Sequence, residues 1–233
     1  MRLVEWEELP VQMQSDEVKE YYMILRRRKG SLLLKRAFDV VVSFLLLVIC
    51  SPVFVILAVA IKIDSKGPVF YRQERVTQYG KTFRIFKFRT MVQNADGGMH
   101  ITVDNDTRIT RVGKKIRKLR LDELGQLIDV LRGTMTFVGT RPEAVKYVEH
   151  YSKSMWATLL LPAGITSEAS IKYKDEDKML TSAADAENVY IHQILPQKMK
   201  YNLAAMRKFS LINDVKIMFQ TVFTVLGKDF SEE

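Results

Sequence analysis

The chain has 233 residues, of which 36 are lysine or arginine and 27 are aspartate or glutamate, giving a formal net charge of +9. Such a charge favours an anionic partner: nucleic acid, acidic lipid headgroups or a phosphorylated substrate. The single cysteine excludes a disulfide framework. The sequence has neither zinc-finger spacing nor an aromatic–basic RNA-binding pattern, so we expect no nucleic acid partner.

Residues 1–30 read as an N-terminal extension with one short helix. Ser15 or Asp16 provides an N-cap, and apolar side chains follow at helical spacing, at Val18, Tyr21, Tyr22 and Leu25. Because Gly30 is a helix breaker, we expect this helix to run through Arg28 and to end before the glycine.

An uncharged apolar run from Val40 to Ile61, broken by Ser51-Pro52, dominates the next segment. The run is long enough for a bilayer-spanning helix, but a proline inside a helix removes a hydrogen bond and kinks it. Both flanks are basic: Arg26, Arg27, Arg28, Lys29, Lys35 and Arg36 precede the run, and Lys62, Lys66, Arg72 and Arg75 follow it.

Positive charge prefers the cytoplasmic side of a membrane, so a simple span would leave one basic flank on the wrong side. We therefore expect a re-entrant membrane helix over residues 31–63, which bends at Ser51-Pro52 and leaves by the face it entered. An ordinary transmembrane helix with a tolerated proline is the alternative.

Residues 64–227 read as a separate, mainly helical α+β domain, and residues 228–233 as a C-terminal tail. Alternating stretches at 69–71 and 83–88, with Gly-Pro and Tyr-Gly turn signals, predict a small β-hairpin. After the hairpin we expect a loop over 94–106 and two helices, one near 114–118 and one over 121–131 that Gly133 ends. A turn or loop at 137–142 and a helical stretch over 143–160 follow. The chain is then expected to be irregular over 162–170 and to form a helix over 183–209 that is interrupted at Pro196.

The last predicted helix is capped by Asn213 or Asp214 and runs to Leu226, where Gly227 ends it. Its broad apolar face consists of Val215, Met218, Phe219, Val222, Phe223 and Leu226. This face either packs on the core or lies on a membrane surface.

The densest polar cluster precedes and includes the acidic pair Asp122-Glu123. Its basic members are Arg108, Arg111, Lys114, Lys115, Arg117, Lys118 and Arg120. In the first turn of a helix the dipole favours negative charge, so both carboxylates are expected to be ionised, which suits a nucleophile or a metal ligand. Arginines can neutralise phosphate through forked hydrogen bonds. The alternative is a solvated basic face beside two good first-turn residues.

A second acidic motif, Asp104-Asn105-Asp106, has the D-x-D form that nucleotide-sugar glycosyltransferases use for a divalent metal. The chain before it lacks the alternating strands and helices of a nucleotide-binding sheet, which favours a loop turn instead. A metal-dependent glycosyltransferase that releases UDP nevertheless stays an alternative.

From about Leu32 to Leu226 the sequence resembles a known family, the bacterial sugar transferases or small monotopic phosphoglycosyl transferases. The matching strings are LKRAFDVVVS (34–43), SP (51–52), IKIDSKGPVFYRQERV (61–76), GKTFRIFKFRTM (80–91), RITRVGKKIRK (108–118), LDELGQL (121–127), VLRGTMTFVGTRPE (130–143) and LPAGIT (161–166).

The resemblance implies a membrane-associated α+β domain, with residues 64–227 as its cytosolic catalytic part, on the cytoplasmic face of the bacterial inner membrane. It implies transfer of a sugar-1-phosphate from a UDP-sugar to polyprenyl phosphate, normally undecaprenyl phosphate, with release of UMP. It further implies a requirement for magnesium and a covalent aspartyl–phosphosugar intermediate. The product would be the first membrane-bound intermediate of capsule, exopolysaccharide or glycoprotein synthesis. A homodimer stays open.

The resemblance also implies roles for individual residues. Asp122 would be the nucleophile and Glu123 the magnesium ligand. The residues implied to bind or support substrate are Arg117, Arg141, Lys87, Arg89 and Arg108.

The chain departs from the family pattern close to these residues. Gly125 and Thr140 stand where the family has proline, and Arg120 stands where it has a small hydroxyl residue that would cap the helix. Further departures are Thr107, Ala163 and Ser167. None removes an expected ionic group, so activity is expected, with a non-catalytic membrane scaffold of the same family as the alternative.

Overall fold

The computed structural model describes residues 1, 3–92, 108–176, 180 and 185–225, and within them the fold is α+β. The helices are α1 (Asp16–Arg27), α2 (Lys29–Asp64), α3 (Arg111–Lys118), α4 (Gln126–Arg132), α5 (Val145–Val148), α6 (Glu168–Lys172), α8 (Ala186–Val189), α9 (Leu195–Arg207) and α10 (Leu211–Val225). Two small sheets are formed by β1 (Phe70–Val76) with β2 (Thr82–Phe88) and by β3 (Met135–Val138) with β4 (Ala163–Thr166).

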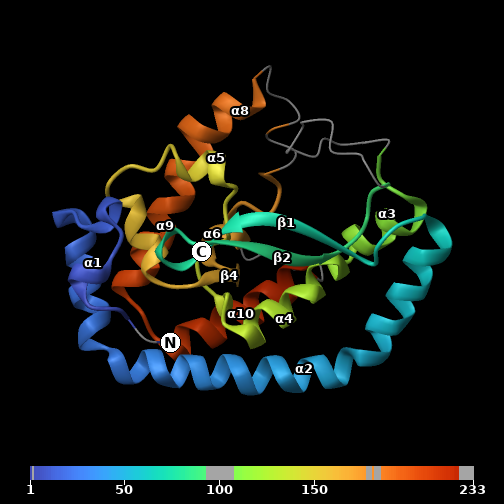
Figure 1. Ribbon diagram of the computed structural model, residues 1–233, viewed down its shortest axis with the longest axis horizontal. Coiled ribbons are helices and arrows are strands. Elements are labelled where there is room, and N and C mark those ends of the chain that lie inside the picture. Colours follow the sequence, from blue (N-terminus) through green and yellow to red (C-terminus); the bar gives the residue numbers. More distant parts are fainter. Residues whose placement is uncertain (2, 93–107, 177–179, 181–184, 226–233) are drawn as a thin grey trace.

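Helix α2 lies along one edge of the domain and bends near its middle (Figure 1). Within the described residues it is the one helix long and apolar enough to cross a membrane. Pro52 cannot donate to the carbonyl of Val48, and the Ser51 hydroxyl donates to that carbonyl instead, at 2.8 Å. The Ser-Pro pair therefore bends the helix without leaving an acceptor unpaired at the bend.

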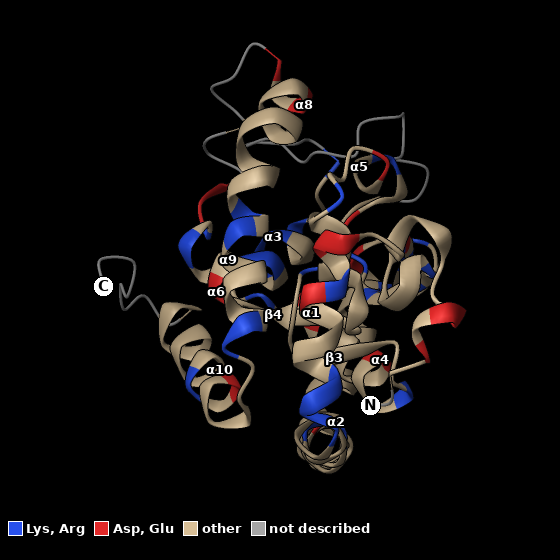
Figure 2. Cartoon of the chain, turned by 90° about the vertical axis from the view of Figure 1, so that its left-hand side faces the viewer, with Lys and Arg blue, Asp and Glu red and all other residues tan. Residues whose placement is uncertain are grey.

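The apolar side chains of α2 are largely exposed. Those that face away from the domain include Val41, Phe44, Leu45, Val48, Ile49, Val55, Ile56 and Val59. In the end-on view of Figure 2, α2 lies at the base of the molecule and carries few charged residues. An exposed apolar surface of this extent is typical of contact with lipid rather than water.

The N-terminal arm of α2 is attached to the domain by buried polar contacts. The Lys35 ammonium lies 2.5 Å from a carboxylate oxygen of Asp214 on α10. Arg36 donates to the last carbonyls of α4 at 2.6 and 2.8 Å, and Asp39 accepts from Thr136 on β3 at 2.7 Å. These contacts satisfy polar groups that would be costly to bury unpaired.

The C-terminal end of α2 is attached as well. Arg89, just after β2, donates to the Ser65 carbonyl at 2.7 Å and contacts the Ser65 hydroxyl at 3.0 Å. The Asp64 carboxylate accepts from the backbone N–H of Val112 in the first turn of α3, at 2.9 Å. Both ends of the membrane helix are therefore fixed to the same domain.

The break between the first two helices differs from the sequence prediction. Helix α1 begins after Ser15, which accepts from Val18 as the expected N-cap, but it ends at Arg27, and Gly30 lies inside α2. The Arg28 side chain donates to the carbonyl of Phe209, which fixes the turn at that residue. The prediction that Gly30 breaks the helix is therefore wrong.

The predicted β-hairpin is confirmed, since β1 and β2 pair antiparallel in register from Phe70 with Phe88 to Val76 with Thr82. The turn or loop expected over 137–142 is confirmed for 139–142 but wrong for 137–138, and the irregular chain expected over 162–170 is wrong for most of its length. β3 and β4 form a parallel pair there, and α6 follows. Gly139 and Gly164 approach so closely that a Cβ on Gly164 would lie 2.2 Å from the Gly139 backbone.

Several predicted helices also need correction. The stretch over 143–160 contains only α5 and a 3-10 turn, Met155–Leu160. The helix expected over 121–131 starts as a 3-10 turn, Leu121–Gly125, but Gly133 ends α4 as predicted, with φ +90°. Pro196 does not interrupt its helix. It lies in the first turn of α9, and a short π-helix, Tyr190–Ile194, joins α9 to α8 without a break.

The last helix begins earlier than predicted. α10 starts at Leu211, so neither Asn213 nor Asp214 is its cap, and Asp214 is buried inside the helix as the partner of Lys35. Of its predicted apolar face, Met218 packs partly buried against the core, whereas Phe219, Val222 and Phe223 are exposed. The loop over 94–106, with Asp104 and Asp106, lies outside the described residues, as does Leu226-Gly227.

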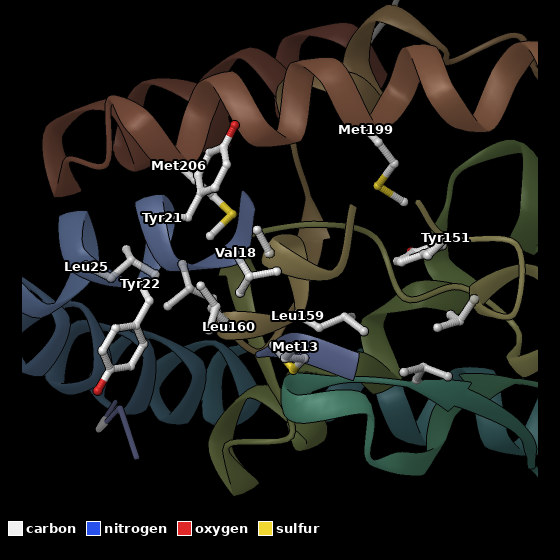
Figure 3. Close-up of a cluster of buried hydrophobic side chains, with 14 of the residues drawn as sticks. Met13, Val18, Tyr21, Tyr22, Leu25, Tyr151, Leu159, Leu160, Met199 and Met206 are labelled. Atoms are coloured by element: carbon white, nitrogen blue, oxygen red, sulfur yellow. The ribbon is translucent and has the colours of Figure 1, made fainter. Parts of the chain in front are cut away.

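The N-terminal extension is part of the largest hydrophobic core. Met13, Val18, Tyr21, Tyr22 and Leu25 are all at least 95% buried. Figure 3 shows them packed with residues from the far end of the chain, namely Tyr151, Leu159, Leu160, Met199 and Met206. Burial of this kind typically stabilises a fold by about 1.5–3 kcal/mol for each large apolar side chain.

Candidate active site

The acidic pair lies in the 3-10 turn Leu121–Gly125, between α3 and α4. Arg120 precedes the turn in the left-handed region, with φ 54°, and makes no side-chain cap. A non-glycine residue held in that region is strained, and such strain is concentrated at functional sites. Leu121 and Leu124 pack into a cluster with Leu57 and Ile61, which belong to the C-terminal arm of α2.

Close backbone packing fixes this turn against the hairpin. A Cβ on Gly125 would lie 2.9 Å from the carbonyl oxygen of Phe86 on β2. The absence of a side chain at Gly125 thus lets the turn approach β2, and the next residue of that strand, Lys87, lies beside the acidic pair.

Glu123 is the centre of the charged contacts. Arg141, between β3 and α5, donates to both carboxylate oxygens of Glu123, and the Lys87 ammonium lies 3.6 Å away. Burial raises the pKa of Glu123, but the charges of Arg141 and Lys87 outweigh it, so the net pKa lies well below the usual value. Glu123 is therefore ionised at neutral pH, as expected.

Asp122 has a different environment. Burial and the neighbouring charge of Glu123 raise the pKa of its carboxyl, whereas Lys87 and Arg117 lower it, and the net shift is upward. The helix-dipole argument predicted that both carboxylates are ionised, and the structure adds that their pKa values are shifted in opposite directions. Adjacent carboxyl groups with pKa values pushed in opposite directions are typical of sites that divide two chemical roles.

A second layer of charge surrounds Arg141. Glu143 is buried and accepts from the Tyr190 hydroxyl at 2.7 Å. The Lys198 ammonium on α9 lies 3.4 Å from Glu143 and 2.9 Å from Glu176. Both carboxylates act electrostatically on Arg141.

The sequence patterns did not identify Glu143, Glu176, Lys198 or Arg75 as residues of the site. Arg75, on β1, is electrostatically coupled to Glu143 and Arg141. Arg75 and Glu143 lie inside matched strings, and Lys198 was detectable as a lysine on the apolar face of α9 with Leu195 and Met199. A charged residue at a core position is a signal for a buried partner.

The other expected site residues lie in different surroundings. Arg117, on α3, is close enough for its charge to lower the pKa of Asp122. Arg89 is buried against the end of α2, where it holds Ser65. Arg108 is adjacent to a β-bridge between Met91 and Ile109, and its carbonyl accepts from Val92 at 2.9 Å.

The donor set suits a magnesium ion that is completed by substrate. Within the described ranges, no three His, Cys, Asp or Glu side chains are arranged to hold a metal. Magnesium usually takes one or two carboxylates and completes its shell with water and substrate phosphates. Glu123 is ionised and adjacent to Asp122, but both of its oxygens accept from Arg141, so a magnesium ion would have to take one of them from that guanidinium.

The family model for bacterial sugar transferases matches residues 30–228. The chain is 37% identical over 198 residues to a UDP-N-acetylgalactosamine-undecaprenyl-phosphate N-acetylgalactosaminephosphotransferase of Aeromonas hydrophila, covering 83% of this chain and 44% of the relative. It is 37% identical over 196 residues to a UDP-glucose:undecaprenyl-phosphate glucose-1-phosphate transferase of Escherichia coli K12, covering 82% and 40%. A protein with the same function name from Caulobacter vibrioides is 34% identical over 199 residues, covering 84% and 70%. The chain thus spans less than half the length of the first two relatives.

Proposed function

The chain belongs to the bacterial sugar transferase family, and we propose that it transfers a sugar-1-phosphate from a UDP-sugar to undecaprenyl phosphate, with release of UMP. The product would start the synthesis of a capsule, an exopolysaccharide or a glycoprotein glycan. The observation that carries the proposal is the acidic pair Asp122-Glu123. Glu123 is paired with Arg141 and Lys87, and the turn that contains the pair packs against α2.

In the proposed reaction Asp122 is the nucleophile. A carboxylate oxygen of Asp122 forms a bond to the donor phosphorus next to the sugar, and the bond from that phosphorus to the UMP oxygen breaks. UMP leaves with the electron pair. A phosphate oxygen of the lipid then attacks the same phosphorus and releases the Asp122 carboxylate. Each step is a displacement at one phosphorus, so no oxidant or further co-reactant is needed.

Both substrates are anionic, and the cations around the pair counter the repulsion between carboxylate and phosphate. Arg141 offers a forked donor to a phosphate, and Lys87 and Arg117 add positive charge on either side of Asp122. Glu123 would hold magnesium, which supplies further neutralisation of phosphate charge when bound. Arg108 is a further candidate for contact with the donor, whereas the contacts of Arg89 favour a structural role at the end of α2.

The proposed topology is re-entrant, at the cytoplasmic face of the bacterial membrane. Both ends of α2 are attached to the same domain, through Lys35 at one end and Asp64 at the other. A helix that crossed the bilayer would separate its ends, so these contacts support a bent helix that returns to its starting face. The packing of Leu121 and Leu124 on α2 would then hold the acidic pair at the level of a lipid phosphate.

The test is nucleotide release from a panel of UDP-sugars, with undecaprenyl phosphate and magnesium. We expect UMP from one or two donors, and at least about a thousandfold slower release for Asp122→Asn, an isosteric change that removes the nucleophile. Asp16→Asn, at an exposed position in the first turn of α1, is the matched control and should retain wild-type turnover.

The products separate the alternatives. Release of UDP would support the D-x-D glycosyltransferase. No nucleotide release from a folded, membrane-bound protein would support the scaffold. Wild-type turnover by Asp122→Asn would contradict the nucleophile assignment.

A further inference from the structure

Lys198 makes a set of buried contacts that the proposed chemistry does not use. Its side chain is 6% exposed, and its ammonium lies 2.9 Å from a Glu176 oxygen, 3.4 Å from a Glu143 oxygen and 3.1 Å from the Tyr190 hydroxyl. The ring of Tyr190 lies 5.0 Å from the same ammonium. Lys198 thus bridges two carboxylates that belong to distant parts of the chain.

The same two carboxylates also attract Arg141. Glu143 follows Arg141 by two residues, and both Glu143 and Glu176 raise the pKa of its guanidinium, although Glu123 has the largest effect. Arg141 is therefore paired directly with Glu123 and also feels the charges of Glu143 and Glu176. Glu143 and Glu176 compete with Glu123 for the Arg141 guanidinium unless other cations offset their charge, and Arg75 already acts on Glu143.

Lys198 is placed to provide that neutralisation. Burial lowers the pKa of Lys198, but the charges of Glu143 and Glu176 outweigh it, and the net pKa is raised, so the lysine is charged at neutral pH. Without it, Glu176 and Glu143 would compete with Glu123 and with phosphate for Arg141. Two unneutralised carboxylates would also repel an anionic donor, because charges in a buried site are poorly screened.

We propose that Lys198 is a positioning residue for the active site: by neutralising Glu143 and Glu176, it keeps the Arg141 guanidinium directed at Glu123 and at the donor diphosphate. The inference rests on the proposed function for the identity of the donor. It assigns a role to α9, which supplies none of the acidic or basic residues that the sequence motifs identified.

The experiment measures UDP binding and UMP release for four chains: wild type, Lys198→Met, Lys198→Arg and the double variant Lys198→Met/Glu176→Gln. We expect Lys198→Met to bind UDP about tenfold more weakly. Lys198→Arg keeps the charge and should stay near wild type. The double variant removes the surplus negative charge and should recover most of the lost affinity.

A surface pair provides the matched control. Lys146 and Glu187 form an ion pair at 2.7 Å between side chains that are 34% and 53% exposed. Lys146→Met should leave UDP affinity unchanged, because screening by solvent makes such a pair weak. Melting temperatures of all variants, measured without nucleotide, separate loss of fold from loss of positioning.

Recovery by the double variant distinguishes positioning from simple stability. If Lys198 only stabilised the core, affinity would follow melting temperature, and Glu176→Gln would recover both together or neither. UDP affinity unchanged in a folded Lys198→Met would overturn the inference. If the wild-type chain binds UDP but releases no UMP, the proposed function is overturned, while the UDP affinities of the variants still test the role of Lys198. If the wild-type chain binds no UDP, the proposed function and the role of Lys198 are both overturned.

Discussion

Lys35 and Asp214 are 179 residues apart in the chain and form a buried ion pair, with 2.5 Å between the ammonium and the nearer carboxylate oxygen. The ammonium also donates to the carbonyl of Val138 at 2.9 Å. One lysine of the membrane helix thus joins the last helix to the end of strand β3. The residues nearest the membrane and those that carry Arg141 are therefore parts of one packed unit.

Lys35→Met should destabilise the protein strongly. It leaves the Asp214 carboxylate buried without a partner, a change that typically costs about 3–5 kcal/mol. Denaturant unfolding in detergent measures the loss. Arg26→Met, which removes an exposed pair with Glu5, should cost under about 1 kcal/mol. Lys35→Met/Asp214→Leu should recover part of the stability, and equal losses for the single and double variants would contradict the pairing argument.

Gly125→Ala should lower both stability and turnover. The added Cβ would lie 2.9 Å from a backbone oxygen of Phe86, so the turn and β2 must separate, at about 1–3 kcal/mol. Gly125→Pro adds the same Cβ, so the residue usual in the family is expected to fit poorly here. Gly30→Ala is the matched control, because nothing lies within 4 Å of its added Cβ. Similar behaviour of Gly125→Ala and Gly30→Ala would refute the close-packing account.

The activity should fall on acidification, because Asp122, as the proposed nucleophile, would have to be ionised to attack. Burial and Glu123 raise the pKa of Asp122, and Arg117 opposes them. Arg117→Met removes a lowering influence, so the pKa rises further and the acid limb of kcat/KM should move to higher pH. The position of the limb is read separately from the overall loss of rate. Lys118→Met, on the exposed side of α3, should leave the limb in place, and an unmoved limb in Arg117→Met would exclude Arg117 as a neighbour of the nucleophile.

Cysteines placed at the two ends of α2 should be labelled from the same side of sealed membranes. The background is a Cys50→Ala chain, and the probes replace Lys29 and Lys66, which flank the helix. A membrane-impermeant maleimide should reach both positions in inside-out vesicles and neither in right-side-out cells. Labelling of one position in each preparation would establish a transmembrane helix instead.

Local patterns were sufficient to predict the elements that depend on neighbouring residues. The Ser15 cap, the long apolar helix with its Pro52 bend, the β1–β2 hairpin and the Gly133 stop all follow from spacing and turn chemistry within a few residues. The β3–β4 pair did not follow, because its partners are far apart in sequence. All four residues of β3 are buried, so the strand shows no alternation.

The same distinction applies to the site. Asp122 and Glu123 were identified because they are adjacent in a matched string, and the structure surrounds them with Lys87 and Arg141. Lys198 and Glu176 could not be found from local patterns, because the reason for their charge lies in residues from other parts of the chain. Such groups become visible only when folding brings the compensating charges together.

Attachment of α2 at both ends has a consequence for how the protein adapts to its lipid surroundings. A single membrane helix usually meets a thicker or thinner bilayer by changing its tilt. Here Lys35 fixes one arm and Arg89 holds the backbone at the end of the other, so tilting would break buried polar contacts. In the proposed topology the lipid, rather than α2, would therefore deform, and the depth at which the acidic pair would meet a lipid acceptor would be set by the fold rather than by the membrane composition.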